Sequence, residues 1–495
     1  MKNRAQLITY VDRLSGGRME DLQRLLAGPL DGVFGGVHLL PFFHPIDGAD
    51  AGFDPIDHTQ VDPRLGNWDD VRALAAQTDL IGDVIVNHVS SHSPQFKDFA
   101  ERGDDSPYAR MFLTYGCVFP DGATESDLAA IYRPRPGLPF TKYSTVQGRQ
   151  ALLWTTFTSE QIDIDVHHLE GQRYLDSVLT RFHHAGIRAI RLDAVGYAVK
   201  KAGTSCFMIP DTFEFIDALT AKAHALGIEV LVEIHAHYRD QIAIARRVDW
   251  VYDFALPPLV LHTLYTRDAT SLKHWLDIRP RNAVTVLDTH DGIGVLDVGA
   301  NRQGPGLLAP EDIDTLVEAI HERSNGQSRH ATGVAASNLD LYQVNCTFYD
   351  ALGRRDDEYL VARAIQCFVP GIPQIYYVGL LAGTNDMDRL RRTGVGRDIN
   401  RHSYTATEVC EELNRPVVRR LIALLKLRNS HPAFGGAFRL LPMRADTIVM
   451  EWRDEAGWVR LDVDLAHAAA SVTCSGAPSD SQGHRVWQSN LQEQA

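Results

Sequence analysis

The stretch that decides the fold is GIRAIRLDA, residues 186–194. This stretch is mostly apolar up to Asp193. Gly186 separates it from an amphipathic segment that precedes it. A short, nearly continuous apolar run is typical of a parallel strand that is buried on both faces of a sheet. We therefore predict a buried strand here, with a carboxylate at its carboxyl end.

Runs of the same kind recur along the chain, with amphipathic segments between them. One segment has helical spacing from Tyr174 to Phe182, and a second from Ile216 to Leu226, where Gly227 is the expected C-cap. Strands that alternate with helices predict an α/β fold, and eight strands are what a (β/α)8 TIM barrel needs. The expected strands are Leu7–Tyr10, Gly36–Pro41, Val84–His88, Ile187–Asp193, Val230–His235, Trp250–Phe254, Val284–Asp291 and Ile375–Val378.

The spacing of these strands predicts how the chain is divided. The segments after the third and seventh strands are too long for one βα unit, so each should hold an inserted subdomain. Beyond the barrel, alternating segments near Thr447 and Trp458 predict a C-terminal antiparallel β domain, and we expect its polar last residues, 475–495, to be loose. The predicted boundaries are 1–85, 168–291 and 355–435 for the barrel, 86–167 and 292–354 for the inserts, and 436–495 for the β domain.

Composition excludes several classes of protein. A net charge of −14 disfavours binding to nucleic acid or to an anionic membrane. No apolar run is long enough for a membrane span, and the first ten residues are typical of a strand rather than of a signal peptide. The 6 cysteines are scattered without a CxxC pair, which argues against a disulfide framework or a zinc site. We expect a cytoplasmic protein without a metal or a cofactor.

Polar side chains end four of the expected strands. A lone Asp after a strand usually forms a turn or caps a helix, and a lone His is usually packed in the core. In a barrel, however, the carboxyl ends of all strands meet at one rim, where three carboxylates and two histidines would converge. Such a cluster indicates catalysis. Its members are Asp193, Glu233 and Asp291, with His88 and His290.

Four segments of the sequence resemble, in the right order, the signature segments of the α-amylase family of retaining glucosidases and transglucosylases. The resemblance runs from the first strand to about residue 435, and it implies the barrel, both inserts and the C-terminal β domain. The four segments are 83–88, 186–194, 230–235 and 286–291, and 52–58 and 61–66 resemble the stretch after the family's second strand.

Several further stretches are similar to the sucrose phosphorylases in particular. Thr289 stands where amylases usually carry Asn, and Val195-Gly196-Tyr197 stands where they usually carry Lys-His; both departures lead away from polysaccharide hydrolases. The amylase calcium site is also in doubt, because Asn87 alone makes no calcium cage. The similar stretches are 191–197, 202–207, 253–258, 288–292, 338–343 and 396–401.

The resemblance implies a role for each residue of the glucosyl pocket. Asp193 would be the nucleophile, kept ionised by Arg191, and Glu233 the general acid, with a raised pKa. Asp291 would hold the sugar 2- and 3-hydroxyls. His88 and His290 would donate to the glucosyl hydroxyls, Phe53 and Phe157 would form a platform under the ring, and Asp50, Gln161 and Arg397 would close the pocket behind one glucosyl unit.

On the acceptor side, the resemblance implies a site for fructose and then for phosphate. Arg135 lies in a proline-rich loop that suits a phosphate-binding guanidinium, although the residues alone favour a solvated basic pair with Arg133. We further hypothesise that the loop at 336–345 exchanges Asp340 for Tyr342 between the two half-reactions. The expected acceptor residues are Tyr132, Arg135, Tyr197, His235, Asp340, Tyr342 and Gln343.

The sequence leaves alternatives for the reaction. One is a hydrolase of the α-glucosidase type, which would not need phosphate. Another is a phosphorylase of sucrose phosphate, glucosylglycerate or glucosylglycerol, although Asp340 would repel an anionic leaving group. A binding module without activity would not need three carboxylates together. The expected partners are small molecules, namely sucrose, phosphate, glucose 1-phosphate and fructose; a homodimer is left open.

Overall fold

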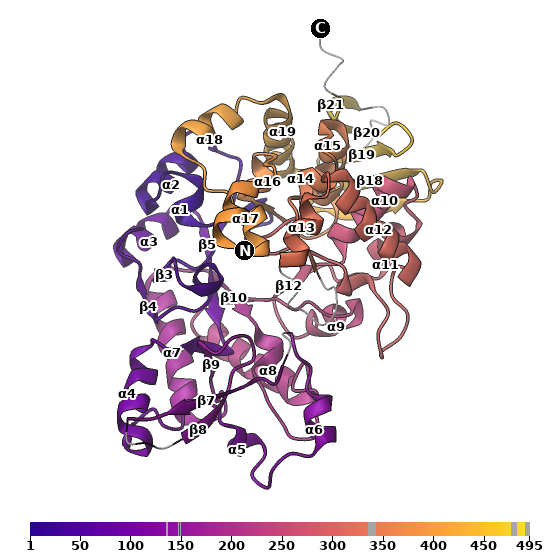
Figure 1. Cartoon of the computed structure of the whole chain (residues 1–495). Helices are drawn as coiled ribbons and strands as arrows, with labels where there is room; N and C mark the ends of the chain where they lie inside the picture. Colours follow the sequence, from indigo (N-terminus) through magenta and orange to yellow (C-terminus); the bar gives the residue numbers. More distant parts are fainter. Residues whose placement is uncertain (135–136, 147, 149, 335–342, 477–482, 491–495) are drawn as a thin grey trace.

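A closed barrel of parallel strands forms the centre of the molecule (Figure 1). The computed structural model describes residues 1–134, 137–146, 148, 150–334, 343–476 and 483–490. Within these residues, eight strands close the barrel in the order in which they follow along the chain, and the last pairs with the first. They are β1 (Gln6–Thr9), β2 (Gly36–Leu39), β5 (Asp79–Ile85), β10 (Ala189–Asp193), β11 (Glu229–Val232), β12 (Trp250–Asp253), β13 (Ala283–Thr285) and β16 (Ile372–Tyr376). The predicted (β/α)8 barrel is confirmed.

Helices surround the barrel where the helical spacing predicts them. Helix α7 ends at His184, and Gly186 then adopts a φ of +77°, a left-handed conformation that glycine accepts without strain. Helix α8 begins at Pro210, whose fixed φ suits a first helical turn. The longer helices around the barrel are α2 (Met19–Ala27), α3 (Trp68–Ala75), α7 (Leu169–His184), α8 (Pro210–Ala225), α10 (Leu256–Thr266), α11 (Thr270–Ile278), α15 (Asp356–Phe368) and α19 (Pro416–Ser430).

Every barrel strand except β10 ends earlier than the sequence pattern predicts. The third strand was expected at Val84–His88, yet β5 ends at Ile85 and His88 begins a separate short strand. The seventh and eighth strands likewise end at Thr285 and Tyr376. Residues beyond the strand ends, such as Val86 and Leu287, are still fully buried beneath the inserted segments. The apolar sequence pattern therefore extends beyond the last residue that pairs with a neighbouring strand.

Two long segments interrupt the barrel and cover its carboxyl rim. The first follows β5 and contains β6 (His88–Ser90), α4 (Pro94–Arg102), α5 (Tyr115–Val118), α6 (Glu125–Ala130), β7 (Phe140–Ser144), β8 (Gln150–Trp154) and β9 (Gln161–Asp163); it forms the lower part of the view in Figure 1. The second follows β13 and contains β14 (Ile293–Gly294), α12 (Pro310–Arg323), α13 (Gln327–Val334) and β15 (Gln343–Val344). The exact domain boundaries stay a prediction.

The C-terminal residues form an antiparallel sheet, as predicted. Its strands are β17 (Ala437–Leu441), β18 (Thr447–Arg453), β19 (Trp458–Asp464), β20 (Ala469–Ser475) and β21 (His484–Gln488). The expectation that the last residues are loose is wrong for β21, which pairs with β20 and buries Trp487. The Trp487 indole donates to the Arg420 carbonyl at 2.9 Å, so one aromatic side chain ties this polar segment to helix α19.

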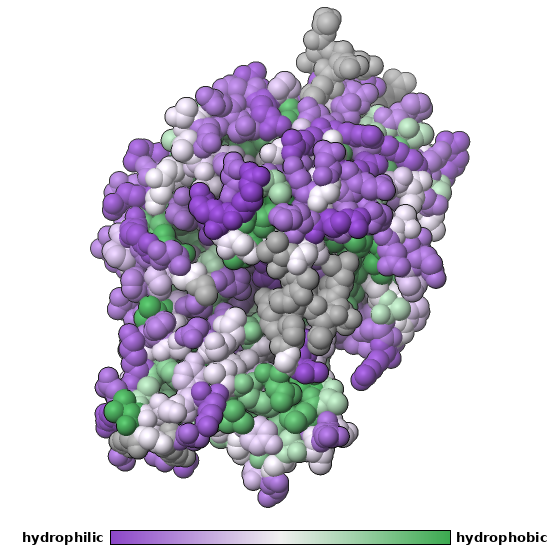
Figure 2. All heavy atoms as spheres, viewed as in Figure 1, coloured by the Kyte–Doolittle hydropathy of each residue, from purple (hydrophilic) through white to green (hydrophobic). Residues whose placement is uncertain are grey.

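The surface is mostly polar, and no helix in the described part of the chain is long and apolar enough to cross a bilayer. Apolar side chains gather over the first inserted segment (Figure 2). Tyr132, Leu138 and Leu152 of this segment are among the exposed large hydrophobic residues.

Candidate active site

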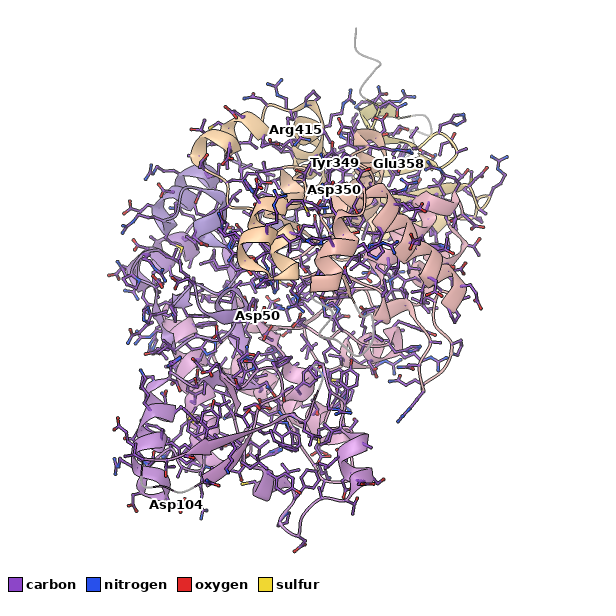
Figure 3. All side chains as sticks on the ribbon, viewed as in Figure 1. Asp50, Asp104, Tyr349, Asp350, Glu358 and Arg415 are labelled. Atoms are coloured by element: carbon purple, nitrogen blue, oxygen red, sulfur yellow. The ribbon has the colours of Figure 1, made fainter. Side chains whose placement is uncertain are left out.

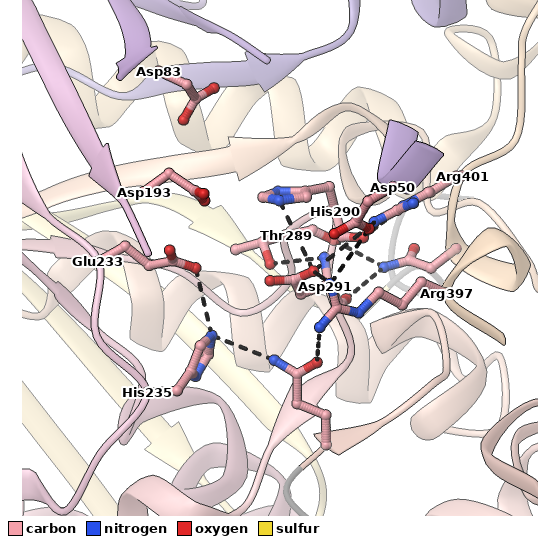
Figure 4. A network of polar contacts seen from close by, with 12 residues as sticks. Asp50, Asp83, Asp193, Glu233, His235, Thr289, His290, Asp291, Arg397 and Arg401 are labelled. Atoms are coloured by element: carbon pink, nitrogen blue, oxygen red, sulfur yellow. Dashed lines mark hydrogen bonds and ion pairs between the residues drawn. The ribbon is translucent and has the colours of Figure 1, made fainter. Parts of the chain in front are cut away.

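The three predicted carboxylates lie at one rim of the barrel (Figure 4). Asp193 is the last residue of β10, Glu233 follows β11 directly, and Asp291 lies in the loop after β13. Arg191, which is 2 % exposed, joins the first two: its Nη1 atom is 2.9 Å from Asp193 Oδ1, and its Nη2 atom is 2.7 Å from Glu233 Oε1. One buried guanidinium thus fixes both carboxylates relative to each other.

Arg191 also contacts a third carboxylate, which the sequence analysis did not single out. Asp83 Oδ1 lies 2.6 Å from Arg191 Nη1, and Asp83 Oδ2 lies 3.2 Å from His38 Nε2. Burial raises the pKa of Asp83, but His38 and Arg191 lower it to about 2. Asp83 belongs to the segment 83–88, and its position between Ile81 and Val84 in a buried strand is the signal that could have found it.

The protonation of Asp193 differs from the expectation. Burial raises its pKa well above the usual range, and Arg191 lowers it without offsetting that rise. The reason is that Arg191 is shared among Asp83, Asp193 and Glu233, so one positive charge faces three carboxyl groups. The contact between Arg191 and Asp193 is confirmed, whereas the raised pKa of Asp193 runs against the expectation that Arg191 keeps it ionised.

Asp291 has the opposite environment. Arg397 Nη1 lies 2.8 Å from Asp291 Oδ1, and Arg401 Nη2 lies 3.9 Å from the same oxygen. Burial raises the pKa of Asp291, but Arg397, His290 and Arg401 hold it well below its usual range. Arg401 is 1 % exposed and donates to the His290 carbonyl at 2.9 Å. The sequence analysis missed Arg401 as a site residue, although it ends the quoted stretch 396–401.

The remaining pocket residues surround these carboxylates. Asp50 Oδ1 lies 3.7 Å from Arg397 Nη1, and Figure 3 places Asp50 near the middle of the molecule. The rings of Phe53 and His290 stack at 4.8 Å. Burial lowers the pKa of His290 to about 3, so its imidazole is neutral at pH 7.

His88 joins the opposite wall of the pocket. Its Nε2 atom lies 3.0 Å from the Phe53 carbonyl and 3.2 Å from Gln161 Nε2, and its ring lies 5.4 Å from that of Phe157. Burial also lowers the pKa of His88, which keeps this imidazole neutral as well. All the residues predicted for the glucosyl pocket therefore meet around one rim.

The acceptor side contains an aromatic group and a polar group. Tyr132 stacks on Phe207 at 4.6 Å and lies 6.2 Å from Tyr197. His235 Nε2 lies 3.8 Å from Glu233 Oε1 and 3.3 Å from Gln343 Nε2. The sequence analysis missed Phe207, although it ends the quoted stretch 202–207. Arg135, Asp340 and Tyr342 lie outside the described residues.

Comparison with known proteins agrees with this geometry. A family model for the α-amylase catalytic domain matches residues 32–245. A sucrose phosphorylase of Agrobacterium vitis is 61% identical over 96% of this chain and 98% of its own, and one of Bifidobacterium adolescentis is 54% identical over 93% and 92%. This chain belongs to the sucrose phosphorylase group of the α-amylase family. The crystal structure of a sucrose 6F-phosphate phosphorylase from Thermoanaerobacter thermosaccharolyticum has a TM-score of 0.89, 37% identity and coverage of 98% and 97%.

A lysine side chain lies beside Asn87, the residue at which the α-amylase family suggests a calcium site. Lys200 Nζ lies 2.6 Å from Asn87 Oδ1 and 2.5 Å from Asp163 Oδ2, and Asn87 Nδ2 donates to Asp163 Oδ1 at 3.1 Å. Asp163 ends β9, which pairs with β6, and the Lys200 side chain is 1% exposed. In this member of the family, an ammonium group therefore supplies the positive charge between Asn87 and Asp163.

One group of side chains has the spacing of a metal site. Ligand atoms of Glu233, His235 and Asp291 all lie within 4.8 Å of one another. Both carboxylates, however, already contact guanidinium groups, those of Arg191 and Arg397. A cation would have to compete with these fixed charges, so the arrangement does not fit a resident metal.

Proposed function

We propose that this chain reversibly transfers the glucosyl unit of sucrose to phosphate, which gives α-glucose 1-phosphate and fructose. It would thus be a hexosyltransferase of the sucrose phosphorylase type. The observation that carries the proposal is the 61% identity, over nearly the full length, with the sucrose phosphorylase of Agrobacterium vitis. The pair Asp193 and Glu233 supports a retaining mechanism, because one guanidinium holds the two carboxyl groups close together, and a short separation is what distinguishes retaining from inverting enzymes.

In the first half-reaction, Asp193 would attack C1 of the glucosyl unit while the bond from C1 to the fructosyl oxygen breaks. Glu233 would donate its proton to that oxygen, so fructose leaves as a neutral sugar and a β-glucosyl-enzyme remains. The position of Arg191 is consistent with these two roles, because it contacts both carboxyl groups and can stabilise whichever one is ionised. This step needs a proton on Glu233 and an ionised Asp193 when sucrose is bound.

In the second half-reaction, an oxygen of phosphate would attack C1 and Asp193 would leave. Glu233 would recover its proton from the phosphate, which restores the acid for the next turnover. Asp291, held ionised by Arg397, would bind the sugar hydroxyls as the ring flattens, and neutral His88 and His290 would donate to others. Asp50, Gln161 and Arg397 would close the pocket, with Phe53 and Phe157 beneath the sugar ring.

The acceptor side would be completed by residues outside the described part of the chain. The phosphate-binding role of Arg135 and the exchange of Asp340 for Tyr342 stay hypotheses, as do the contacts of Tyr132, Tyr197 and Gln343 with fructose. A cytoplasmic location and a homodimer also stay predictions. Cell fractionation and size-exclusion chromatography with light scattering test these two points.

The decisive experiment is incubation with sucrose in the presence and absence of phosphate. We expect glucose 1-phosphate of the α configuration by NMR, formed at a rate that depends on phosphate, with little free glucose. Free glucose in both conditions would instead identify a hydrolase. Sucrose 6'-phosphate, glucosylglycerate and glucosylglycerol, offered in parallel, test the alternative substrates, and Asp193→Asn serves as the inactive control.

A further inference from the structure

A buried aspartate lies behind the acceptor side and belongs to none of the predicted sets. Asp297 is in the short 3-10 turn Leu296–Val298 and is 0% exposed. Its Oδ2 atom lies 3.3 Å from His235 Nδ1, and its Oδ1 atom accepts from Gln241 Nε2 at 3.1 Å. Among the described residues, no Lys or Arg lies within ion-pair distance of this carboxylate. His235 is thus its partner for charge compensation in the described structure.

The pair is held rigidly. The His235 ring stacks on Phe254, with centroids 3.9 Å apart and planes inclined by 18°. Gly294 covers the contact: a Cβ atom there would lie 2.7 Å from Asp297 Oδ2 and 3.4 Å from His235 Nδ1. These contacts favour one ring orientation, in which Nδ1 faces Asp297 and Nε2 faces Gln343 and Glu233.

The hydrogen bonds around His235 indicate which of its ring nitrogens carries the proton. Arg397 Nη2 donates to Gln343 Oε1 at 3.4 Å, which turns the Gln343 amide nitrogen toward His235 Nε2 at 3.3 Å. His235 Nε2 then accepts from Gln343, and Nδ1 donates to Asp297. This is a neutral imidazole whose Nε2 lone pair lies beside Glu233, and a hydroxyl of a neutral ligand such as fructose would replace the Gln343 amide as its donor.

The same surroundings also favour the charged imidazole. Burial lowers the pKa of His235, but Asp297, Glu233 and Asp291 outweigh burial and raise it above the usual value. Among the described residues, the groups that face the ring include these three carboxylates, the Gln343 amide and the Phe254 ring. An anionic ligand at Nε2 would add to the same effect.

We propose that Asp297 is a positioning residue that makes His235 a two-state group: a neutral hydrogen-bond acceptor when fructose occupies the acceptor side, and an imidazolium donor when phosphate does. This inference rests on the proposed function. Dihydrogen phosphate would enter and pass one proton to His235 Nε2, which leaves hydrogen phosphate beside an imidazolium. After attack on C1, the remaining phosphate proton would go to Glu233, and His235 would return its proton to solvent when the product leaves.

The test is Asp297→Asn in the full-length enzyme, with Asp240→Asn as the matched control. Asp240 also lies near this segment, on helix α9 (Tyr238–Ile244), but its carboxylate binds Gln303 rather than His235. In Asp297→Asn, we expect kcat/KM for phosphate to fall roughly 10–100-fold, the size of a lost charge-assisted contact. Phosphate-independent cleavage of sucrose should fall far less, and the control should match the wild type.

The pH profile separates this role from a merely structural one. Asp297 raises the pKa of His235, so phosphate use should persist to higher pH in the wild type and be lost as pH rises through that pKa. In Asp297→Asn, this loss should move to lower pH. His235→Gln should lose phosphate efficiency as well, together with its contact to fructose, and adding Asp297→Asn to it should lower kcat/KM for phosphate no further.

Two results would overturn the proposal. The first is an unchanged kcat/KM for phosphate in Asp297→Asn while the wild type depends on phosphate, which would contradict the role of Asp297 alone. The second is a wild type whose rate does not depend on phosphate, which would contradict the proposed function as well. A third result applies where the variant cannot be studied. If Asp297→Asn does not fold, histidine NMR of the wild type decides. Protonation of His235 upon addition of inorganic phosphate supports the proposal, and an unchanged neutral ring contradicts it.

Discussion

The donor side and the acceptor side of this site are built from different parts of the chain. On the donor side, Asp193 and Arg191 lie on a barrel strand, and the carboxylates are paired with arginines at fixed distances. On the acceptor side, Tyr132 comes from the first insert and Gln343 from the second. The difference follows from the ligands that we propose: one neutral glucosyl ring on the donor side, but both fructose and phosphate on the acceptor side. A rigid frame suits the first, and movable or titrating groups suit the second.

The largest expected effect is on the donor side. Asp193→Asn should lower sucrose phosphorolysis by at least roughly 10⁴-fold, because no other carboxylate can form the glucosyl-enzyme. The fold should persist, as circular dichroism would show. Mass spectrometry of a trapped glucosyl adduct checks the assignment, and an adduct on any residue other than Asp193 contradicts it.

Glu233 lies between the two sides, so its variant should discriminate between leaving groups. Glu233→Gln should lower turnover of sucrose by roughly 10²–10⁴-fold, since the fructosyl oxygen needs a proton. Glucosyl fluoride, whose leaving group needs no acid, should be affected much less. The measurement is kcat/KM for both donors, and equal losses would mean that Glu233 is not the general acid.

Removal of the charge that holds Asp291 should produce a pH-dependent loss. We expect Arg397→Gln to lower kcat/KM for sucrose by on the order of 100-fold, the upper end of a charge-assisted contact. Arg397 lowers the pKa of Asp291, so this pKa should be higher in the variant. As pH falls, Asp291 should therefore become protonated at a higher pH in the variant than in the wild type. A pH profile identical in shape to that of the wild type would argue against this role.

An acceptor-side variant should separate the two half-reactions. Arg135→Ala should lower phosphate efficiency by roughly 10–100-fold while the glucosyl-enzyme still forms and water still hydrolyses it slowly. Phosphate-dependent and phosphate-independent cleavage are measured in the same preparation, with Arg133→Ala as the matched control. Parallel loss of both rates would make Arg135 a structural residue.

The smallest effect concerns metals. Treatment with EDTA should change neither activity nor melting temperature, because Lys200 and the active-site arginines already supply the positive charges. Activity before and after dialysis, with added calcium as the control, checks this. A loss that calcium restores would show that the cluster around Glu233 or Asn87 binds a cation.

The sequence predicted the parts that depend on local patterns. The runs of apolar residues located the barrel strands, and the polar residues at their ends located the carboxylates of the donor side. The sequence did not reveal Asp83, Arg401, Lys200 or Asp297, because each acts through a partner far away in the chain. Nor did it predict β21, since its polar residues are held by pairing with β20 and by one buried tryptophan.

The positive charge between Asn87 and Asp163 belongs to a lysine side chain, so it does not depend on the ions in solution. Calcium is a hard ion that prefers oxygen ligands, and the oxygens of phosphate are ligands of this kind. An exchangeable calcium in the wall of the pocket would be withdrawn by the very acceptor that we propose. Because Lys200 cannot dissociate, rising phosphate can saturate the reaction without loosening the pocket in which it takes place.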